Sequence, residues 1–224
     1  MMIYMISGNK GGVGKSMMAS VMIDHLLSSK KQVLLIDADM HNPDVFKPHV
    51  NNDGVTTHAI DLSRSEGWID LVNLLDQDRE KCVVINTPAG SNQGVMKHGG
   101  TLTAALPELG QKLQVLWVIN RNRDSLEALR EFRDSQPSWP VTIVRNNHYG
   151  EADKFELFNN SKLRGEIEAA GGQVIDLPDL ADRVSDQLAV ERLSIAAANN
   201  KMNLGNRIEL QRWRATCHKA LEVV

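Results

Sequence analysis

A glycine-rich loop near the start of the chain restricts the possible folds more than any other segment. Residues 3–6 are apolar and predict a strand, and residues 10–16 follow with the sequence KGGVGKS. The glycines of this loop are Gly11, Gly12 and Gly14. They allow backbone N–H groups to turn toward phosphate oxygens, while Lys15 supplies a positive charge and the Ser16 hydroxyl can hold Mg²⁺. The order of strand, loop and helix predicts a phosphate-binding loop in an α/β protein.

The loop departs from the common phosphate-loop pattern at two positions. Asn9 stands where that pattern has its first glycine, and Lys10 is a second lysine inside the loop. With these departures the segment resembles the deviant Walker A box of the ParA/MinD family of P-loop ATPases. In that family the extra lysine contacts phosphates bound by the other subunit of a nucleotide-sandwich dimer, and this role falls to Lys10. The resemblance implies ATP and Mg²⁺ as ligands, an ATP-dependent homodimer, a catalytic Lys15, and nucleotide contacts from Val13 and Met17.

Two aspartates follow the second predicted strand. Residues 33–36 are apolar, and Asp37 and Asp39 come directly after them. The carboxyl ends of parallel strands face the ligand crevice, although these residues taken alone fit solvated aspartates equally well. The resemblance implies that Asp39 orients the attacking water and that Asp37 lies near the metal, together with Ser16.

A third segment departs from the family at one position. Residues 82–90 resemble the Walker B and switch II stretch, in which the last strand residue is usually an aspartate, but this chain has Asn86 there. An amide oxygen can accept a hydrogen bond from a water on Mg²⁺ but carries no negative charge. We expect Asn86 near the metal, with weak Mg²⁺ dependence or slow ATP hydrolysis.

The resemblance also suggests contacts to the adenine base. In the family an asparagine at the end of a late strand faces the base, which gives Asn146 here, or Asn147 in the alternative register. A loop after the last strand can pack against the base through Pro178. Ordinary turn chemistry explains this proline equally well.

Strand and helix patterns alternate along the whole chain, which predicts an α/β fold with a mostly parallel central sheet and helices on both faces. We expect a single domain over residues 1–224. The expected strands are residues 3–6, 32–36, 55–60, 83–85, 115–119, 141–144 and 174–175. The expected helices are residues 15–27, 66–75, 124–132, 161–171 and 206–224, with one more between 96 and 109. Asp124 and Glu127 have the spacing of a capping box, and Ser161 is an expected N-cap.

Composition and charge limit the classes of protein to which this chain can belong. Of 224 residues, 42% are hydrophobic, which is ample for one core, and the net charge of −3 argues against a uniformly basic nucleic-acid binder. The two cysteines form no disulfide or metal pattern, and we expect no signal peptide or membrane span. The expected location is the bacterial cytoplasm, with nucleoid association if DNA is bound.

The last predicted helix allows three interpretations. Its apolar stripe consists of Leu210, Trp213, Cys217, Leu221 and Val224. We favour packing of this stripe against the rest of the fold. A DNA contact through Arg207, Arg212 and Arg214 is the second interpretation. A membrane anchor is the least favoured, because the stripe is short and has one aromatic residue. A second candidate basic patch consists of Arg121, Arg123, Arg130 and Arg133.

These features predict an ATP-dependent dimerising switch that acts in plasmid or chromosome partition or stability, through DNA or a DNA-bound adaptor protein. Conjugative transfer and division-site placement are alternatives within the same class. A different class is a phosphotransferase, since residues 37–43 also resemble the DAD-x-x-x-P stretch of bacterial tyrosine kinases. Such kinases usually end in a tyrosine cluster, whereas this chain has only Tyr4 and Tyr149.

Overall fold

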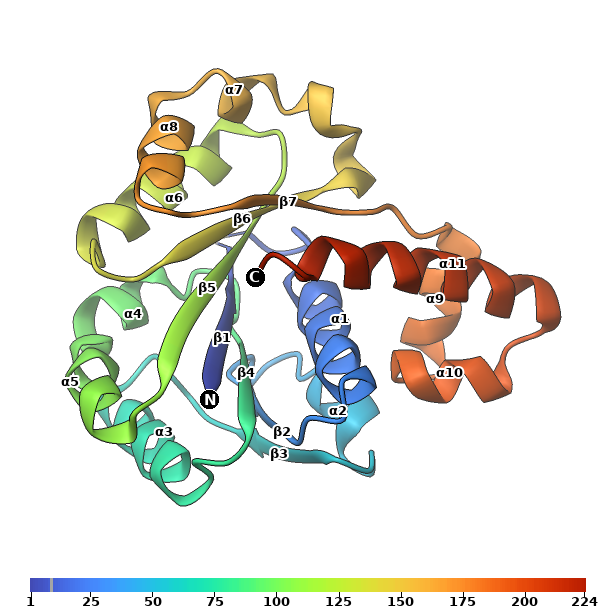
Figure 1. Ribbon diagram of the computed structural model, residues 1–224, viewed down its shortest axis with the longest axis horizontal. Helices are drawn as coiled ribbons and strands as arrows, with labels where there is room; N and C mark the ends of the chain where they lie inside the picture. Colours follow the sequence, from blue (N-terminus) through green and yellow to red (C-terminus); the bar gives the residue numbers. More distant parts are fainter. Residues whose placement is uncertain (9) are drawn as a thin grey trace.

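The computed structural model describes residues 1–8 and 10–224, so the prediction made at Asn9 lies outside the described residues. Its centre is a seven-stranded sheet in the order β3-β2-β4-β1-β5-β6-β7, and every neighbouring pair is parallel (Figure 1). The strands are β1 (Met2–Ser7), β2 (Val33–Asp37), β3 (Val55–Ala59), β4 (Cys82–Asn86), β5 (Lys112–Ile119), β6 (Val141–Asn146) and β7 (Val174–Leu177). The predicted parallel sheet is confirmed.

Helices cover both faces of the sheet, as the buried apolar runs of the strands require. One face carries α3 (Ser65–Gln77), α4 (Asn92–His98), α5 (Gly100–Leu109), α6 (Arg123–Ser135), α7 (Glu156–Asn159) and α8 (Lys162–Ala169). The other carries α1 (Lys15–Ser28), α9 (Asp182–Val190), α10 (Ile195–Lys201) and α11 (Leu204–Leu221). The short α2 (Phe46–His49) follows β2, and two 3₁₀ turns, η1 (Asn147–Tyr149) and η2 (Ala152–Lys154), follow β6. The apolar residues form one core on each face.

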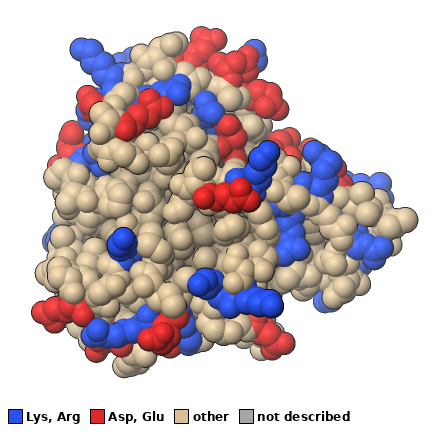
Figure 2. Space-filling view, viewed as in Figure 1, with Lys and Arg blue, Asp and Glu red and all other residues tan. Residues whose placement is uncertain are grey.

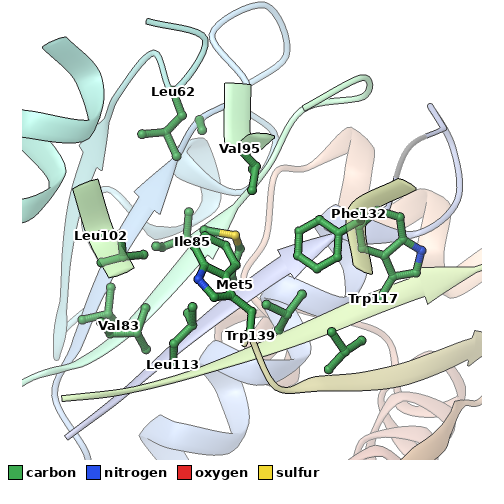
Figure 3. Close-up of a cluster of buried hydrophobic side chains, with 14 of the residues drawn as sticks. Met5, Leu62, Val83, Ile85, Val95, Leu102, Leu113, Trp117, Phe132 and Trp139 are labelled. Carbon is green, nitrogen blue, oxygen red and sulfur yellow. The ribbon is translucent and has the colours of Figure 1, made fainter. Parts of the chain in front are cut away.

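Three aromatic side chains anchor the core under α4, α5 and α6 (Figure 3). The Phe132 ring lies 4.7 Å from the Trp117 ring and 6.0 Å from the Trp139 ring, measured between ring centroids. The Trp139 indole N–H donates to the Thr103 hydroxyl at 2.9 Å, so its one polar group is satisfied inside the core. These contacts hold β5 and α6 together.

Three helix predictions can be compared with the structure. The Ser161 cap is confirmed, because its hydroxyl accepts from the Arg164 N–H at 3.2 Å. The helix expected between residues 96 and 109 is confirmed as α5, but the separate helix α4 before it was not predicted. The two helices meet at Gly99, where a Cβ would lie 2.5 Å from the Val95 carbonyl oxygen, so the close approach requires glycine. The capping box at Asp124 is wrong: α6 starts one residue earlier and has no side-chain cap.

The α11 stripe packs as predicted. Leu210, Trp213, Cys217 and Leu221 are buried and Val224 is partly buried, in the core shared with α1, α9 and α10. In Figure 1, α9, α10 and α11 stand beside the sheet, with α11 crossing α1. We call α9 to α11 the C-terminal lobe. None of the helices that the structure describes is long and apolar enough to cross a membrane.

Candidate nucleotide site

A cavity of about 320 Å³ lies where β1, β2 and β4 end, directly over the first turn of α1. It is lined by Gly11, Gly12, Gly14, Lys15, Ser16, Met17, Asp39, Asn42, Asp44, Thr87 and Ala89. The structure therefore brings the predicted phosphate loop and Asp39 to one cavity. Asn42, Asp44 and Thr87 are additional polar residues that were not among the predicted site residues. We call this space the phosphate cavity.

The loop is held in shape from the end of β6. Gly14 has φ +107°, and a Cβ there would lie 2.4 Å from the Asn146 side-chain nitrogen, so the position needs glycine on both counts. The same Asn146 nitrogen donates to the Val13 carbonyl at 2.9 Å. The Tyr149 hydroxyl donates to the Gly12 carbonyl at 2.7 Å, a contact that no sequence pattern predicted. These bonds pair the Gly12 and Val13 carbonyls with side chains at and after the end of β6.

Lys15 lies at the base of the phosphate cavity. Its side chain is 7% exposed and its ammonium donates to the Lys10 carbonyl at 2.9 Å. Burial lowers the pKa of Lys15 to about 8, although the nearby negative charge of Asp39 opposes that shift. A phosphate group in the cavity would add negative charge beside the ammonium and raise this pKa again. The pKa of Lys15 therefore depends on whether an anion occupies the phosphate cavity.

Lys10 lies on the outside of the loop. Its ammonium forms an ion pair with Asp124 near the start of α6, and both side chains remain well exposed. The hydrogen bond from Lys10 lowers the pKa of the Asp124 carboxyl. An exposed ion pair of this kind is weak, so Lys10 can leave it at small cost.

Asp37 and Asn86 form a buried pair at the adjacent ends of β2 and β4. The Asn86 amide donates to Asp37 Oδ1 at 3.0 Å, and Asp37 Oδ2 accepts from the Phe46 N–H at 2.9 Å. Burial raises the pKa of Asp37, and the Asn86 hydrogen bond opposes that shift. The pair holds one negative charge, whereas an aspartate at position 86 would place two carboxylates side by side.

The site offers oxygen atoms suited to Mg²⁺. The Asn86 side-chain oxygen is buried and has no hydrogen-bond partner in the described part of the chain. Ser16, the last residue of the phosphate loop, lines the phosphate cavity. The described residues contain no cluster of three or more His, Cys, Asp or Glu side chains fit to hold a metal alone. This sparse set fits Mg²⁺, which is usually held by one or two protein oxygens together with phosphates and waters.

Asp39 is partly exposed and lines the phosphate cavity. Its Oδ1 accepts from the Asn42 N–H at 2.9 Å, while its own N–H donates to Asp37 Oδ1 at 3.2 Å. The two aspartates are therefore distinct: both oxygens of Asp37 are bound by protein donors, whereas Asp39 lines the cavity and its Oδ2 has no hydrogen-bond partner among the described residues. A water between Asp39 and a bound phosphate would find an acceptor here.

The predicted base contacts lie outside the phosphate cavity. Asn146 supports the loop from behind and is 8% exposed, whereas the Asn147 amide is directed to Glu151 at 3.4 Å. The Pro178 carbonyl accepts from the Trp213 indole N–H at 2.8 Å, which ties its loop to α11. The structure places Asn146 next to the phosphate loop, and base contact by either asparagine stays a prediction.

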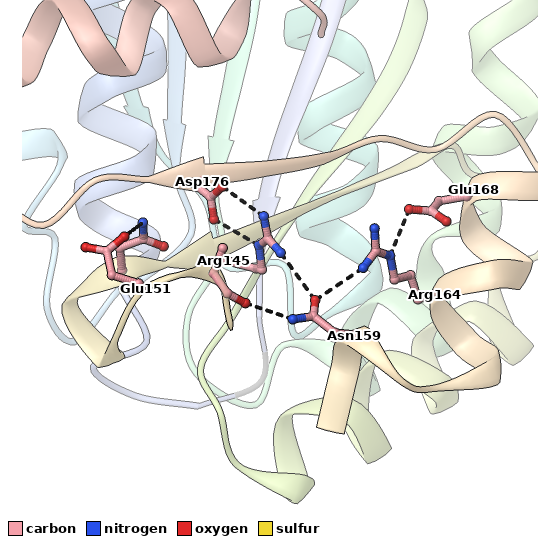
Figure 4. Close-up of polar contacts among 8 residues, drawn as sticks. Arg145, Glu151, Asn159, Arg164, Glu168 and Asp176 are labelled. Carbon is pink, nitrogen blue, oxygen red and sulfur yellow. Dashed lines mark hydrogen bonds and ion pairs between the residues drawn. The ribbon is translucent and has the colours of Figure 1, made fainter. Parts of the chain in front are cut away.

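A polar network stiffens the segments around these residues (Figure 4). The Arg145 guanidinium binds both oxygens of Asp176 on β7, at 2.9 and 2.8 Å, and donates to Asn159 at 3.2 Å. Arg164 joins Asn159 to Glu168. A bidentate pair across neighbouring strands fixes the ends of β6 and β7, and hence the place of Asn146.

Most of the arginines expected to contact DNA are paired with carboxylates. Arg212 binds Glu209, and Arg214 binds the buried Asp24 of α1. Arg123 and Arg130 of the second patch pair with Glu127 and Glu166. Figure 2 shows acidic and basic side chains together along the upper and lower edges of the visible face, a largely uncharged centre, and mainly basic side chains over the C-terminal lobe.

Comparison with known proteins agrees with this geometry. The family described as the CobQ/CobB/MinD/ParA nucleotide binding domain matches residues 4–157. Protein MobD of Acidithiobacillus ferrooxidans is 49% identical over 222 residues, covering 99% of this chain and 97% of that protein. Protein TraL of Escherichia coli is 24% identical over 226 residues, covering 93% and 92%.

Solved structures share the fold. A plasmid partition protein of Borrelia burgdorferi bound to AMPPNP has a TM-score of 0.64 at 17% identity, covering 99% of this chain and 97% of that one. MinD in the MinC:MinD complex of Aquifex aeolicus has a TM-score of 0.63 at 14% identity, covering 99% and 96%. At these identities the likeness concerns the fold alone.

Proposed function

The chain belongs to the CobQ/CobB/MinD/ParA nucleotide-binding family, and from that premise we propose that it is an ATP-dependent dimerising switch of the ParA/MinD type. Two copies close face to face on ATP and Mg²⁺, the closed dimer holds DNA or a partner protein, and hydrolysis releases it. The observation that carries this proposal is Lys10. It stands on the rim of the phosphate loop, exposed, in a weak ion pair with Asp124 that a phosphate of the other subunit can replace.

Each part of the cavity has a task in this scheme. The loop N–H groups and Lys15 bind the phosphates, with Val13 and Met17 completing the contacts. Asp39 orients the attacking water. Pre-formed charges at the base of a buried cavity stabilise the developing negative charge of phosphoryl transfer without reorganisation.

Ser16 and Asn86 would hold Mg²⁺, with Asp37 fixing the Asn86 amide. The ion, when bound, neutralises charge on the phosphate oxygens. Because Asn86 brings no charge, this site attracts Mg²⁺ less strongly than a site with a carboxylate at the same position. We therefore propose slow hydrolysis that a partner stimulates.

We assign the switch to partition or stability of a plasmid or chromosome in the bacterial cytoplasm. Support comes from the fold shared with a plasmid partition protein, while conjugative transfer and division-site placement are the alternatives. DNA contact would rely chiefly on Arg207, because Arg212 and Arg214 are already paired within the protein. The phosphotransferase alternative gains nothing from Tyr149, whose hydroxyl is bound to the phosphate loop.

Light scattering tests the proposal directly. The oligomeric state is measured without nucleotide, with ADP, and with AMPPNP plus Mg²⁺. We expect a dimer only with AMPPNP, lost in Lys10→Ala and retained in Lys31→Ala, an exposed lysine beyond the far end of α1. A monomer in every state, despite measurable nucleotide binding, would overturn the dimer switch.

A further inference from the structure

A second cavity of about 400 Å³ lies beside the phosphate cavity and has no task in the scheme above. It is formed between the first turns of α1, the segment that includes α2, the second half of α9, and the start of α10. Ser16, Met17 and Asp44 line both cavities. Anything bound in this second space therefore touches residues that also face the phosphates. We call it the side cavity.

The side cavity combines an apolar floor with two basic residues and one acidic residue, Asp44, which lies on the side shared with the phosphate cavity. The floor contains Leu188, Leu193 and Ile195, which are all buried. Lys47 of α2 and Arg192, just after α9, are exposed and line the cavity from two different elements. Burying apolar surface is favourable, and unpaired cations attract anions, so the cavity suits an apolar group that carries negative charge on either side.

Lys47 and Arg192 are distinguished by their place rather than by being unpaired. Within the part of the chain that the structure describes, neither has an ion pair or a side-chain hydrogen bond, and both line the side cavity. Arg183, Lys201 and Arg207 also form no ion pair among the described residues but do not line it, and Arg212 and Arg214 are each bound to a carboxylate. Two charges left unpaired beside an apolar space mark a surface whose complement comes from another molecule.

Arg192 also occupies a costly backbone conformation. Its φ is +50°, at the residue that closes α9, where its N–H donates to the Ala189 carbonyl at 3.2 Å. Glycine is the usual residue at such a helix end, because a side chain in this conformation is strained. Lys30 has the same backbone conformation after α1, at φ +57°, but does not line the side cavity. It is therefore a matched control for substitutions of Arg192.

We propose that the side cavity binds an acidic peptide segment of a partner protein. One bulky apolar side chain enters the floor, and carboxylates before and after it pair with Lys47 and Arg192. An extended strand advances about 3.3 Å per residue, so a short segment crosses the mouth and places charges on both sides. Binding is coupled to the nucleotide through Ser16, Met17 and Asp44, and this coupling alone rests on the proposed function.

Fluorescence anisotropy of labelled hexapeptides tests the proposal. The probes are an alternating Leu/Glu peptide, a Leu/Lys peptide and a Ser/Glu peptide. We expect only the Leu/Glu peptide to bind the full chain, and its affinity to fall about fivefold or more in Lys47→Glu and in Arg192→Glu. Lys30→Glu should leave it unchanged. Ala189→Trp, which fills the mouth, should abolish it.

The remaining outcomes separate this proposal from the switch. Equal binding of the Ser/Glu peptide, or binding that survives both charge reversals, would overturn it by showing general attraction. Failure of the Leu/Glu peptide to bind, with AMPPNP-dependent dimers intact, would overturn the side cavity and leave the switch standing. We expect Lys15→Ala to lose nucleotide binding yet still bind the peptide, and AMPPNP plus Mg²⁺ to change peptide affinity at least about threefold in the unaltered chain.

Discussion

The phosphate cavity and the C-terminal lobe use polar groups in opposite ways. Between α1 and the lobe, Arg214 and His218 of α11 both bind Oδ2 of the buried Asp24, whose Oδ1 has no partner among the described residues, so these charges hold the helices together. At the phosphate cavity, Lys10 is held by an exposed ion pair and the Asn86 oxygen has no partner among the described residues. Satisfied charges stabilise a fold, while incompletely satisfied ones prepare a site for a ligand.

The difference extends to the packing around each region. The lobe depends on an apolar stripe with few polar contacts, of which the bond from Trp213 to the Pro178 carbonyl is one. The phosphate loop depends on hydrogen bonds from Asn146 and Tyr149 to its carbonyls. Damage to the lobe should therefore appear in stability, and damage to the loop in ligand binding.

Trp213→Ala breaks the lobe and has the largest expected effect. Removing this fully buried indole leaves a cavity and an unpaired Pro178 carbonyl, which should lower the free energy of unfolding by about 3–5 kcal/mol. Chemical denaturation measures the loss. Arg212→Ala on the exposed side of the same helix should change stability by less than about 0.5 kcal/mol. Loss of phosphate binding without loss of stability in Trp213→Ala would contradict the division between the two regions.

The low pKa of Lys15 makes the stability of the nucleotide-free protein depend on pH. The unfolded chain holds this proton up to its ordinary pKa of 10.5, but the folded protein releases it near 8. Between these values the unfolded state binds more protons, so stability without nucleotide rises with pH, by up to about 3 kcal/mol from this group. Denaturation between pH 7.5 and 10.5, compared with Lys15→Met, isolates the contribution. Saturating nucleotide should remove it, and identical pH profiles in both proteins would refute it.

Asn86→Asp sharpens the comparison by adding a charge to the site. A second buried carboxylate beside Asp37 should destabilise the protein without metal by about 1–3 kcal/mol, because like charges would meet in a site that excludes water. Mg²⁺ with ATP should offset that loss and raise the hydrolysis rate. Thermal unfolding with and without Mg²⁺ provides the measurement, and Asn92→Asp, at another buried asparagine, is the control. Unchanged Mg²⁺ affinity and ATPase rate would show that Asn86 is not near the metal.

The sequence could predict the strands and the loop because their signals are local. Alternating apolar runs and a glycine-rich turn are determined by neighbours in the chain, and residues 10–16 and 33–39 came together as expected. The break at Gly99 could not be predicted, since it depends on space beside the Val95 carbonyl. The hydrogen bond from Tyr149 could not be predicted for a similar reason, because no sequence pattern links its hydroxyl to the Gly12 carbonyl, 137 positions away.

The charges were the least predictable part of the molecule. A basic residue on a helix looks the same in sequence whether it is free or paired, and Arg214 proved to be bound to Asp24, 190 positions away. Asp124 had the spacing of a helix cap, yet in the structure its carboxylate pairs with Lys10. Long-range pairing is set by how the sheet brings loops together, which local patterns do not encode.

Asp124→Asn should give the smallest effect, and it tests whether the ion pair restrains the switch. Without the carboxylate, Lys10 no longer has to leave a partner before it contacts the phosphates of a second subunit, so the AMPPNP dimer should form at a protein concentration up to about fivefold lower. Sedimentation at several concentrations measures the change, and the effect should shrink at high salt because the pair is exposed. Asp134→Asn, near the other end of α6, is the control that should leave dimerisation unaltered. If Asp124→Asn instead weakens the dimer, Asp124 supports Lys10 in the closed state and the pair is part of the switch itself.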